Sequence, residues 1–241
     1  VFSRQFFPMP VYHNIKTIFV RVPKTATTSI CEKLYTADSF AKYFNKGQLA
    51  AASLAPIEET EKHETIRKIR DNTPHNCFKD YFKVAFVRNP WDWLVSYYSY
   101  FQTNDISKKS ILVNGRFQRG TNRFGDISFK QFLSTVEQRS EEYNIDDDLS
   151  QLVYPLQPQY KYLIDDSGKI IVDFVGRYEN LNNDWATLID KLGINNPSRP
   201  MGLQRLNSTP DKDYRTYYEP NDVERVYKIY KKDVELFGYE F

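Results

Sequence analysis

The sequence has few of the features that mark a disulfide-rich, metal-binding or membrane-spanning protein. Only 2 cysteines occur among its 241 residues. These residues, Cys31 and Cys77, form no Cys-x-x-Cys pair and have no histidine pair nearby at the spacing of zinc ligands, so we expect two buried thiols. The longest apolar stretch, residues 49–55, falls far short of the roughly 20 residues needed to cross a bilayer. A disulfide scaffold is therefore excluded, and no membrane span is predicted in this chain.

An excess of one charge and clustered glycines are also missing. The 33 Lys and Arg residues nearly balance the 31 Asp and Glu residues, which gives no general attraction for nucleic acid, and we expect no nucleic-acid partner. The 9 glycines include no glycine-rich phosphate loop of the GxxxxGK[ST] type. No repeat or linker tract divides the chain. We expect one α/β domain over residues 1–241, with an N-terminal extension at 1–15.

Three short β-rich runs are the strongest strand candidates: residues 17–22, 84–88 and 169–175. The first two are almost continuously apolar, and each leads into a helix signal, which is typical of buried parallel strands. Helical spacing of apolar residues predicts helices over 90–101 and from Phe129, and two more that stop at Gly193 and Gly238. The alternation of strands and helices favours a mostly parallel sheet with helices on its faces.

The segment after the first predicted strand has the composition of an anion site. Lys24, Thr25, Ala26, Thr27, Thr28 and Ser29 stand between that strand and an expected helix through Leu34. Free backbone N–H groups and the dipole at a helix N-terminus attract phosphate or sulfate, hydroxyls add donors, and lysine adds a full charge. The alternative is that the hydroxyls only cap the helix and Lys24 lies in solvent.

A second candidate anion site follows the second predicted strand. Arg88 stands at the carboxyl end of that strand, and Asn89-Pro90 has the pattern of a helix cap and first helical residue, with Ser96 inside the helix. Ligands bind outside the carboxyl ends of strands in open parallel sheets. Arg88 has the planar fork that suits a phosphate, and Ser96 would add a donor.

The two segments PKTATTS and VRNPWDWLVSYY, each after a hydrophobic strand, resemble the signature loops of sulfotransferases that use 3′-phosphoadenosine 5′-phosphosulfate. The stretches 173–181 and 230–239 are similar to the carbohydrate branch of that family, with its Golgi and bacterial members. The resemblance implies a nucleoside-kinase-like α/β fold and an enzyme that moves a sulfuryl group to an acceptor hydroxyl, with adenosine 3′,5′-bisphosphate as product. It also implies that the loop at 24–29 binds the 5′-phosphosulfate, with Lys24 near the bridging oxygen, and that Arg88 and Ser96 bind the 3′-phosphate.

Sulfuryl transfer also needs a base that accepts the hydroxyl proton, and histidine suits this role because its pKa lies near neutrality. His63 resembles the family histidine between the two loops; the alternative is an exposed histidine on a charged helix over residues 58–70. His13 precedes the first strand, and we expect His75 to lie in a turn. If His63 lies far from the loop, the role would pass to His75 or to a carboxylate (Glu58, Glu59 or Glu64).

Two further groups of basic residues are weaker candidates. Arg177 and Arg215 would each suit a nucleotide phosphate, but a surface ion pair explains them at least as well, and only Arg215 is kept as a candidate. A basic run from Lys108 to Arg123 lies within residues 104–168, which we expect to be an acceptor-side insertion with loops. Within it, Arg116, Arg119 and Arg123 are candidates for contacting an anionic glycan.

Two other functions remain compatible with these patterns. A nucleotide kinase would use a similar loop but should show a glycine-rich turn and a carboxylate for Mg²⁺. A non-catalytic module would bind anionic glycans through the basic run and ignore the nucleotide. Because no paired carboxylates follow the strands, we expect no metal. The location is expected to be cytoplasmic for a bacterial or viral protein and the Golgi lumen for a truncated eukaryotic one, with the cytoplasm favoured.

Overall fold

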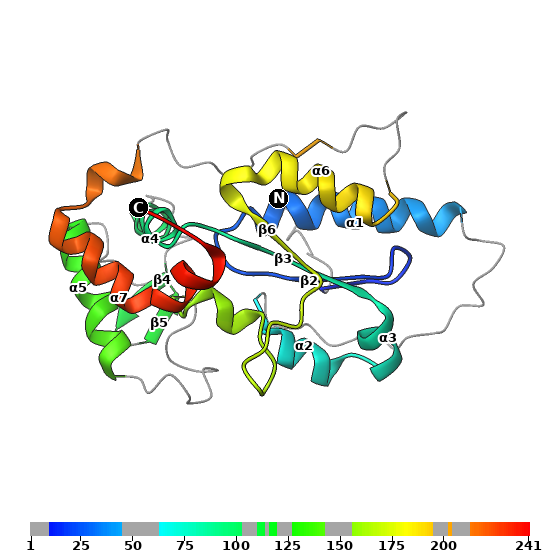
Figure 1. Ribbon diagram of the computed structural model, residues 1–241, viewed down its shortest axis with the longest axis horizontal. Coiled ribbons are helices and arrows are strands. Elements are labelled where there is room, and N and C mark those ends of the chain that lie inside the picture. Colours follow the sequence, from blue (N-terminus) through cyan, green and yellow to red (C-terminus); the bar gives the residue numbers. More distant parts are fainter. Residues whose placement is uncertain are drawn as a thin grey trace. The chain divides into compact units, whose positions relative to one another are not determined.

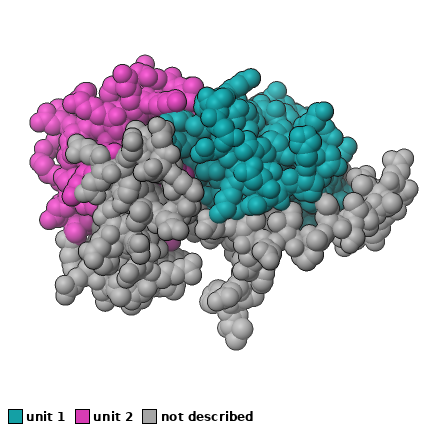
Figure 2. Space-filling model, turned by 90° about the horizontal axis from the view of Figure 1, so that it is seen from below, with its two compact units in different colours: residues 1–87, 160–207 teal, residues 88–159, 208–241 magenta. Residues whose placement is uncertain are grey.

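The computed structural model describes residues 10–44, 63–102, 110–113, 116–119, 127–142, 156–194, 202–203 and 213–241. Its helices and strands are, in chain order, β1 (Val11–Tyr12), β2 (Thr17–Val20), α1 (Thr27–Phe44), α2 (Ile66–Asn72), α3 (His75–Asp80), β3 (Phe82–Val87), α4 (Pro90–Phe101), β4 (Ser110–Val113), β5 (Arg116–Arg119), α5 (Phe129–Glu142), the 3-10 turn η1 (Gln159–Tyr162), β6 (Phe174–Arg177), η2 (Tyr178–Asn180), α6 (Leu181–Lys191), η3 (Tyr214–Tyr217) and α7 (Pro220–Phe237). They belong to two compact units, coloured separately in Figure 2. Unit 1 comprises residues 1–87 and 160–207, and unit 2 comprises residues 88–159 and 208–241.

Unit 1 is built on a four-stranded sheet with the order β1-β2-β3-β6. The pairs β2–β3 and β3–β6 are parallel, and β1 pairs antiparallel with β2. The predicted α/β sheet is therefore confirmed, although it is mixed because of the antiparallel edge strand. β1 lies within the stretch 1–15 that the sequence analysis set apart as an extension. Since β2 and β3 are parallel neighbours, the chain leaves both strands at the same edge of the sheet.

The third predicted strand is wrong in its position. The sheet strand is β6, Phe174–Arg177, rather than residues 169–175. The first part of that apolar run turns back on the chain before it, because Gly168 adopts a left-handed φ of 80° and Ile170 forms an isolated antiparallel bridge with Ile164. The apolar run is thus shared between a small hairpin and the sheet, which a pattern of hydrophobicity alone does not separate.

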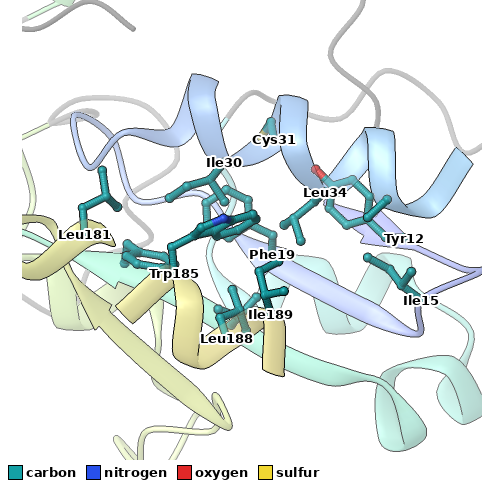
Figure 3. Packing of buried hydrophobic residues seen from close by; sticks show 13 residues of the cluster. Tyr12, Ile15, Phe19, Ile30, Cys31, Leu34, Leu181, Trp185, Leu188 and Ile189 are labelled. Atoms are coloured by element: carbon teal, nitrogen blue, oxygen red, sulfur yellow. The ribbon is translucent and has the colours of Figure 1, made fainter. Parts of the chain in front are cut away.

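The core of unit 1 lies between the sheet and two helices. Figure 1 shows α1 and α6 along one side of the sheet and α2 and α3 on the other. In Figure 3, Ile30 and Leu34 of α1 and Trp185 of α6 surround Phe19 of β2, and all four are buried. The near-continuous burial of β2 and of the second half of β3 is what buried parallel strands require. Both cysteines are buried free thiols, as predicted.

Unit 2 contains α4, α5, α7, η3 and the β4–β5 hairpin. The predicted helix over 90–101 is confirmed as α4, and the side chain of Asn89 caps it by accepting a hydrogen bond of 3.0 Å from the Trp91 N–H. α7 ends as predicted at Gly238, whose φ of 60° is left-handed. Trp93 of α4 packs edge-on against Tyr230 of α7, with ring centroids 5.6 Å apart. The hairpin was not predicted.

No helix among the described residues combines the length and the apolar character that a membrane crossing demands.

Candidate functional site

The loop between β2 and α1 has an unusual backbone. Lys24 and Ala26 both adopt a φ of 61°, whereas Thr25 and Thr27 are not among the residues with positive φ. A nest, an anion-binding concavity of main-chain N–H groups, forms where left- and right-handed conformations alternate, and the left-handed φ at Lys24 and at Ala26 fits that pattern. Left-handed conformations at non-glycine residues cost roughly 1–2 kcal/mol each. The surroundings must therefore hold the loop in place, and strain of this kind gathers at functional sites.

The Val22 carbonyl is the group that holds this loop. It accepts hydrogen bonds from the hydroxyls of Thr25 and Thr27, each 2.8 Å long. Val22 and Thr25 are fully buried, so the bond between them is shielded from water, whereas the bond from Thr27 is partly buried. From the sequence these hydroxyls were expected to bind the ligand, but in the structure both donate to the Val22 carbonyl and shape the turn. The main-chain N–H groups are then the donors that this loop offers to an anion.

Helix α1 begins at Thr27, directly after the loop, as predicted. Its first turn contains no acidic residue, so no side-chain charge there opposes the positive end of the helix dipole. Ser29 is buried, and Lys24 and Thr28 are half-buried. Of the residues that the sequence assigned to the phosphosulfate, 24–26 thus lie on the loop and 27–29 form the start of α1.

His63 belongs to unit 1 and contacts the same turn. Its Nδ1 lies 2.8 Å from the carbonyl oxygen of Arg21, three residues before Lys24. A carbonyl only accepts hydrogen bonds, so Nδ1 carries the proton and the lone pair of the neutral ring is on Nε2. This is the tautomer that a base acting through Nε2 needs. The alternative of a histidine on a charged helix is wrong, because α2 begins only at Ile66.

The other candidate bases lie elsewhere or outside the described residues. His13 Nδ1 is 2.9 Å from the hydroxyl of Tyr81, which directly precedes β3, so His13 lies at the amino edge of the sheet. His75 is the exposed first residue of α3, not part of a turn, and leads to that same edge. Glu64 is buried next to His63 and lies 3.8 Å from Lys68. Glu58 and Glu59 fall outside the described residues.

Arg88 opens unit 2 and is 6% exposed. Its guanidinium forms a two-bond pair with Asp92, one turn into α4, from Nε at 2.7 Å and from Nη2 at 2.9 Å. From the sequence this guanidinium was expected to bind a phosphate, and in the structure the carboxylate of Asp92 orients it. Asp92 was missed, although its position four residues after Arg88 at a helix start is the signal that finds it.

The remaining nucleotide candidates in unit 2 differ in their surroundings. Ser96 is buried within α4. Arg215 is half-exposed, lies 4.6 Å from the ring centre of Tyr214 and is 3.5 Å from Asp213, so it keeps a surface-type environment. Arg177 ends β6 in unit 1, and its N–H donates to Asp184. Arg116 and Arg119 are the first and last residues of β5, their side chains are not described, and Arg123 lies outside the described residues.

Within the described residues, no three His, Cys, Asp or Glu side chains are grouped closely enough to hold a metal ion. What unit 1 offers is a main-chain nest, a lysine and a histidine on neighbouring turns. Such a set can bind an anion, stabilise negative charge and accept a proton.

The chain belongs to the sulfotransferase family: the family model matches residues 9–240. Its four-stranded sheet flanked by helices is consistent with the fold of that family, and the predicted resemblance is confirmed. Carbohydrate sulfotransferase 10 of Danio rerio is 22% identical over 93% of the chain and 64% of its own length. Carbohydrate sulfotransferase 11 of Mus musculus is 23% identical over 92% of the chain and 64% of its own length. The chain therefore spans slightly less than two thirds of these vertebrate relatives.

A shorter relative has a higher sequence identity to the chain over the part that aligns. A protein of Archaeoglobus fulgidus, described only as uncharacterized, is 30% identical over 150 residues, which are 61% of the chain and 93% of that protein.

Proposed function

We propose that this protein transfers a sulfuryl group from 3′-phosphoadenosine 5′-phosphosulfate to a hydroxyl of a carbohydrate. The observation that carries the proposal is the main-chain nest at Lys24 and Ala26, placed between β2 and α1 in a member of the sulfotransferase family. Family membership favours sulfuryl transfer over the kinase and the non-catalytic glycan module. Both vertebrate relatives are carbohydrate sulfotransferases by name, which supports a glycan as acceptor.

The proposal divides the donor between two segments. The N–H groups of residues 24–29 hold the 5′-phosphosulfate, and Thr25 and Thr27 keep the loop in shape. Arg88 and Ser96 hold the 3′-phosphate, and Arg215 is a weaker additional candidate. Support comes from the topology of the sheet: the loop leaves β2, and the chain leaves β3 toward Arg88, at the same edge.

The reaction is an in-line displacement at sulfur. A bond forms between the acceptor oxygen and sulfur, the bond between sulfur and the bridging phosphate oxygen breaks, and the hydroxyl proton leaves. Lys24 supplies positive charge where negative charge builds up on the leaving oxygen. The main-chain N–H groups of the nest stabilise charge on the same phosphate. They are already in position before the ligand binds, so no free energy is spent on orienting them.

His63 is proposed as the base. The Arg21 carbonyl fixes the proton on Nδ1, so that Nε2 accepts the proton of the acceptor hydroxyl. For His63→Ala we expect kcat to fall by a factor of about 10²–10⁴, the usual contribution of a general base, with little change in nucleotide affinity. If kcat keeps its pH dependence in this variant, another group is the base.

The acceptor side rests on the basic run. Reversing the charge of Arg116, Arg119 and Arg123 together should raise KM for a sulfated or carboxylated acceptor and leave nucleotide affinity unchanged. A neutral acceptor is the control. An equal rise of KM for the neutral acceptor would remove the basis of this assignment.

Incubation of the protein with radiolabelled donor and a panel of glycans tests the proposed function. We expect label on at least one glycan, release of adenosine 3′,5′-bisphosphate, and no loss of rate with EDTA. Calorimetry with that bisphosphate is the companion measurement, and no binding to the wild-type protein would overturn the proposal. The cytoplasmic location favoured by the sequence stays a prediction.

A further inference from the structure

Arg88 is held by a buried glutamine, Gln159, which a buried aspartate, Asp233, holds in turn; both lie far from Arg88 in sequence. Gln159 and Asp233 are each 0% exposed, and both belong to unit 2. Neither residue has a signal in the sequence that connects it with Arg88. Buried polar groups are costly unless they are bonded, so their partners indicate what they do.

The side-chain amide of Gln159 forms hydrogen bonds to both the main-chain N–H and the main-chain carbonyl of Arg88. The Arg88 N–H donates to Gln159 Oε1 over 2.9 Å, and Gln159 Nε2 donates to the Arg88 carbonyl over 2.7 Å. The amide gives the main chain of Arg88 one donor and one acceptor, as a neighbouring strand would. Gln159 thus fixes the backbone of Arg88 directly after the end of β3.

Helix α7 fixes Gln159 in turn. The main-chain N–H of Gln159 donates to Asp233 Oδ2 over 2.7 Å, and the hydroxyl of Tyr230 donates to the Leu156 carbonyl over 2.9 Å. Tyr230 has non-helical dihedral angles at a kink of α7, φ −111° and ψ 24°. α7 therefore holds the segment 156–159 at two points on either side of Gln157.

We propose that Gln159, supported by Asp233, is a positioning residue for recognition of the 3′-phosphate. This inference rests on the proposed function, in which Arg88 binds that phosphate. Asp92 orients the guanidinium and Gln159 fixes the backbone from which it extends, so loss of Gln159 displaces the fork without removing it. Displacement of about 1 Å is enough to weaken a bidentate interaction strongly.

The experiment compares two nucleotides that differ only in the 3′-phosphate, adenosine 3′,5′-bisphosphate and adenosine 5′-phosphate. Calorimetry gives a ratio, the Kd of adenosine 5′-phosphate divided by the Kd of adenosine 3′,5′-bisphosphate, for the wild type, Gln159→Leu, Arg88→Ala and the double variant. We expect Gln159→Leu to lower the ratio about tenfold, as loss of one good hydrogen bond to a charged group does. Its affinity for adenosine 5′-phosphate should not change, and the double variant should lose no more than Arg88→Ala alone.

Matched variants separate positioning from general damage to the fold. Gln102→Ala removes another glutamine of unit 2 whose amide donates to a main-chain carbonyl, that of Ile127, and it should leave the ratio unchanged. Asp233→Asn keeps an acceptor for the Gln159 N–H and should retain most of the ratio.

If Gln159→Leu does not fold, Gln159→Glu serves in its place. A carboxylate has no proton to donate to the Arg88 carbonyl, whereas its protonated form does. The ratio should therefore be low at pH 8 and recover toward the wild-type value, measured at the same pH, as the pH falls. A ratio that follows the wild type at every pH would contradict the proposal.

Equal weakening of both nucleotides by Gln159→Leu, or additive losses in the double variant, would overturn the positioning role. Failure of the proposed function has a different signature: Arg88→Ala would then leave the ratio unchanged in an otherwise intact protein.

Discussion

The two candidate anion sites are built in different ways. In unit 1 the loop at 21–27 presents main-chain N–H groups, and the first turn of α1 carries no acidic residue. In unit 2 the start of α4 presents a side chain, and its first turn contains Asp92, which pairs with Arg88. The hydroxyls of the first site serve the backbone, whereas the carboxylate and amide of the second site serve an arginine.

This difference predicts how each site responds to mutation. A site made of N–H groups tolerates changes of side chain unless they alter the backbone or remove a full charge. A site made of one guanidinium depends on every residue that orients it. Substitutions in the two sites should therefore differ both in which property they change and in how large the change is.

Among variants of the two anion sites, the largest effect is expected for Lys24→Ala. Removing the full charge near the leaving oxygen should lower kcat by a factor of about 10²–10³, as loss of one electrostatic stabiliser does. Nucleotide affinity should change less, because the N–H groups remain. Steady-state kinetics together with calorimetry measure both quantities, and Lys24→Arg is the control that keeps the charge. A loss confined to affinity would show that Lys24 acts only in binding.

Substitution of Ala26 tests the nest itself. Ala26→Val places a β-branched residue at a φ of 61°, which its side chain disfavours strongly, whereas Ala26→Gly relieves the strain. We expect the valine variant to bind adenosine 3′,5′-bisphosphate at least about tenfold more weakly, a loss comparable to 1.4 kcal/mol of backbone strain. The glycine variant should bind about as well as the wild type. Equal affinities for all three proteins would show that the backbone shape is not what binds the anion.

Gly176→Ala changes the sheet of unit 1 outside either site. A Cβ at this position would lie 2.4 Å from a ring carbon of Phe86 of β3, which is buried in the core of unit 1. Overpacking of this kind destabilises by about 1–3 kcal/mol. Urea unfolding measures the loss, and the folded fraction should keep the wild-type nucleotide affinity. Unchanged stability would mean that Phe86 moves aside at no cost.

The hydroxyl of Thr25 is expected to matter for stability rather than for catalysis. Thr25→Val keeps the shape but removes the donor to the Val22 carbonyl, which still accepts from Thr27. The free energy of unfolding should fall by about 0.5–1.5 kcal/mol, the net value of one hydrogen bond, and Thr25→Ser should restore most of it. If Thr25→Val instead lowers kcat without any loss of stability, the hydroxyl contacts the substrate.

The smallest effect is expected for His13, at the opposite edge of the sheet, and concerns how stability depends on pH. Burial lowers the pKa of His13 below its ordinary value of 6.5, and Asp38 opposes this shift only in part. The unfolded chain then binds more protons, so His13 makes stability rise with pH between its folded pKa and 6.5. Unfolding at pH 5 to 7 should show a shallower rise for His13→Gln than for the wild type. A steeper rise would contradict the lowered pKa.

Much of the framework was predictable from the sequence because local signals were strong. The strands β2 and β3 have almost continuous apolar runs, and the helices α4 and α7 combine helical spacing with a cap, Asn89-Pro90 before α4 and Gly238 after α7. The β4–β5 hairpin also had a signal that was not used, since Asn114-Gly115 between apolar residues is a strong indicator of a two-residue hairpin. The true position of β6 had no such signal, because the apolar run at 169–175 has the same periodicity in the part that enters the sheet as in the part that does not.

The site was predictable only in part. Residue types and their order pointed to Lys24, His63 and Arg88, because each stands near the end of a strand or between two such ends. The left-handed angles at Lys24 and Ala26 were not predictable, since neither residue prefers them. The bonds between Gln159 and Arg88 and between Gln159 and Asp233 join positions 71 and 74 residues apart, and a single sequence carries no record of such pairs.

Calorimetry with adenosine 3′,5′-bisphosphate, repeated on Ala26→Val and Arg88→Ala, tests most directly whether one nucleotide is held by both segments. The account predicts one nucleotide per chain for the wild type and a weaker Kd for that same binding event in each variant. Two nucleotides per chain, with each variant weakening a different one, would contradict it.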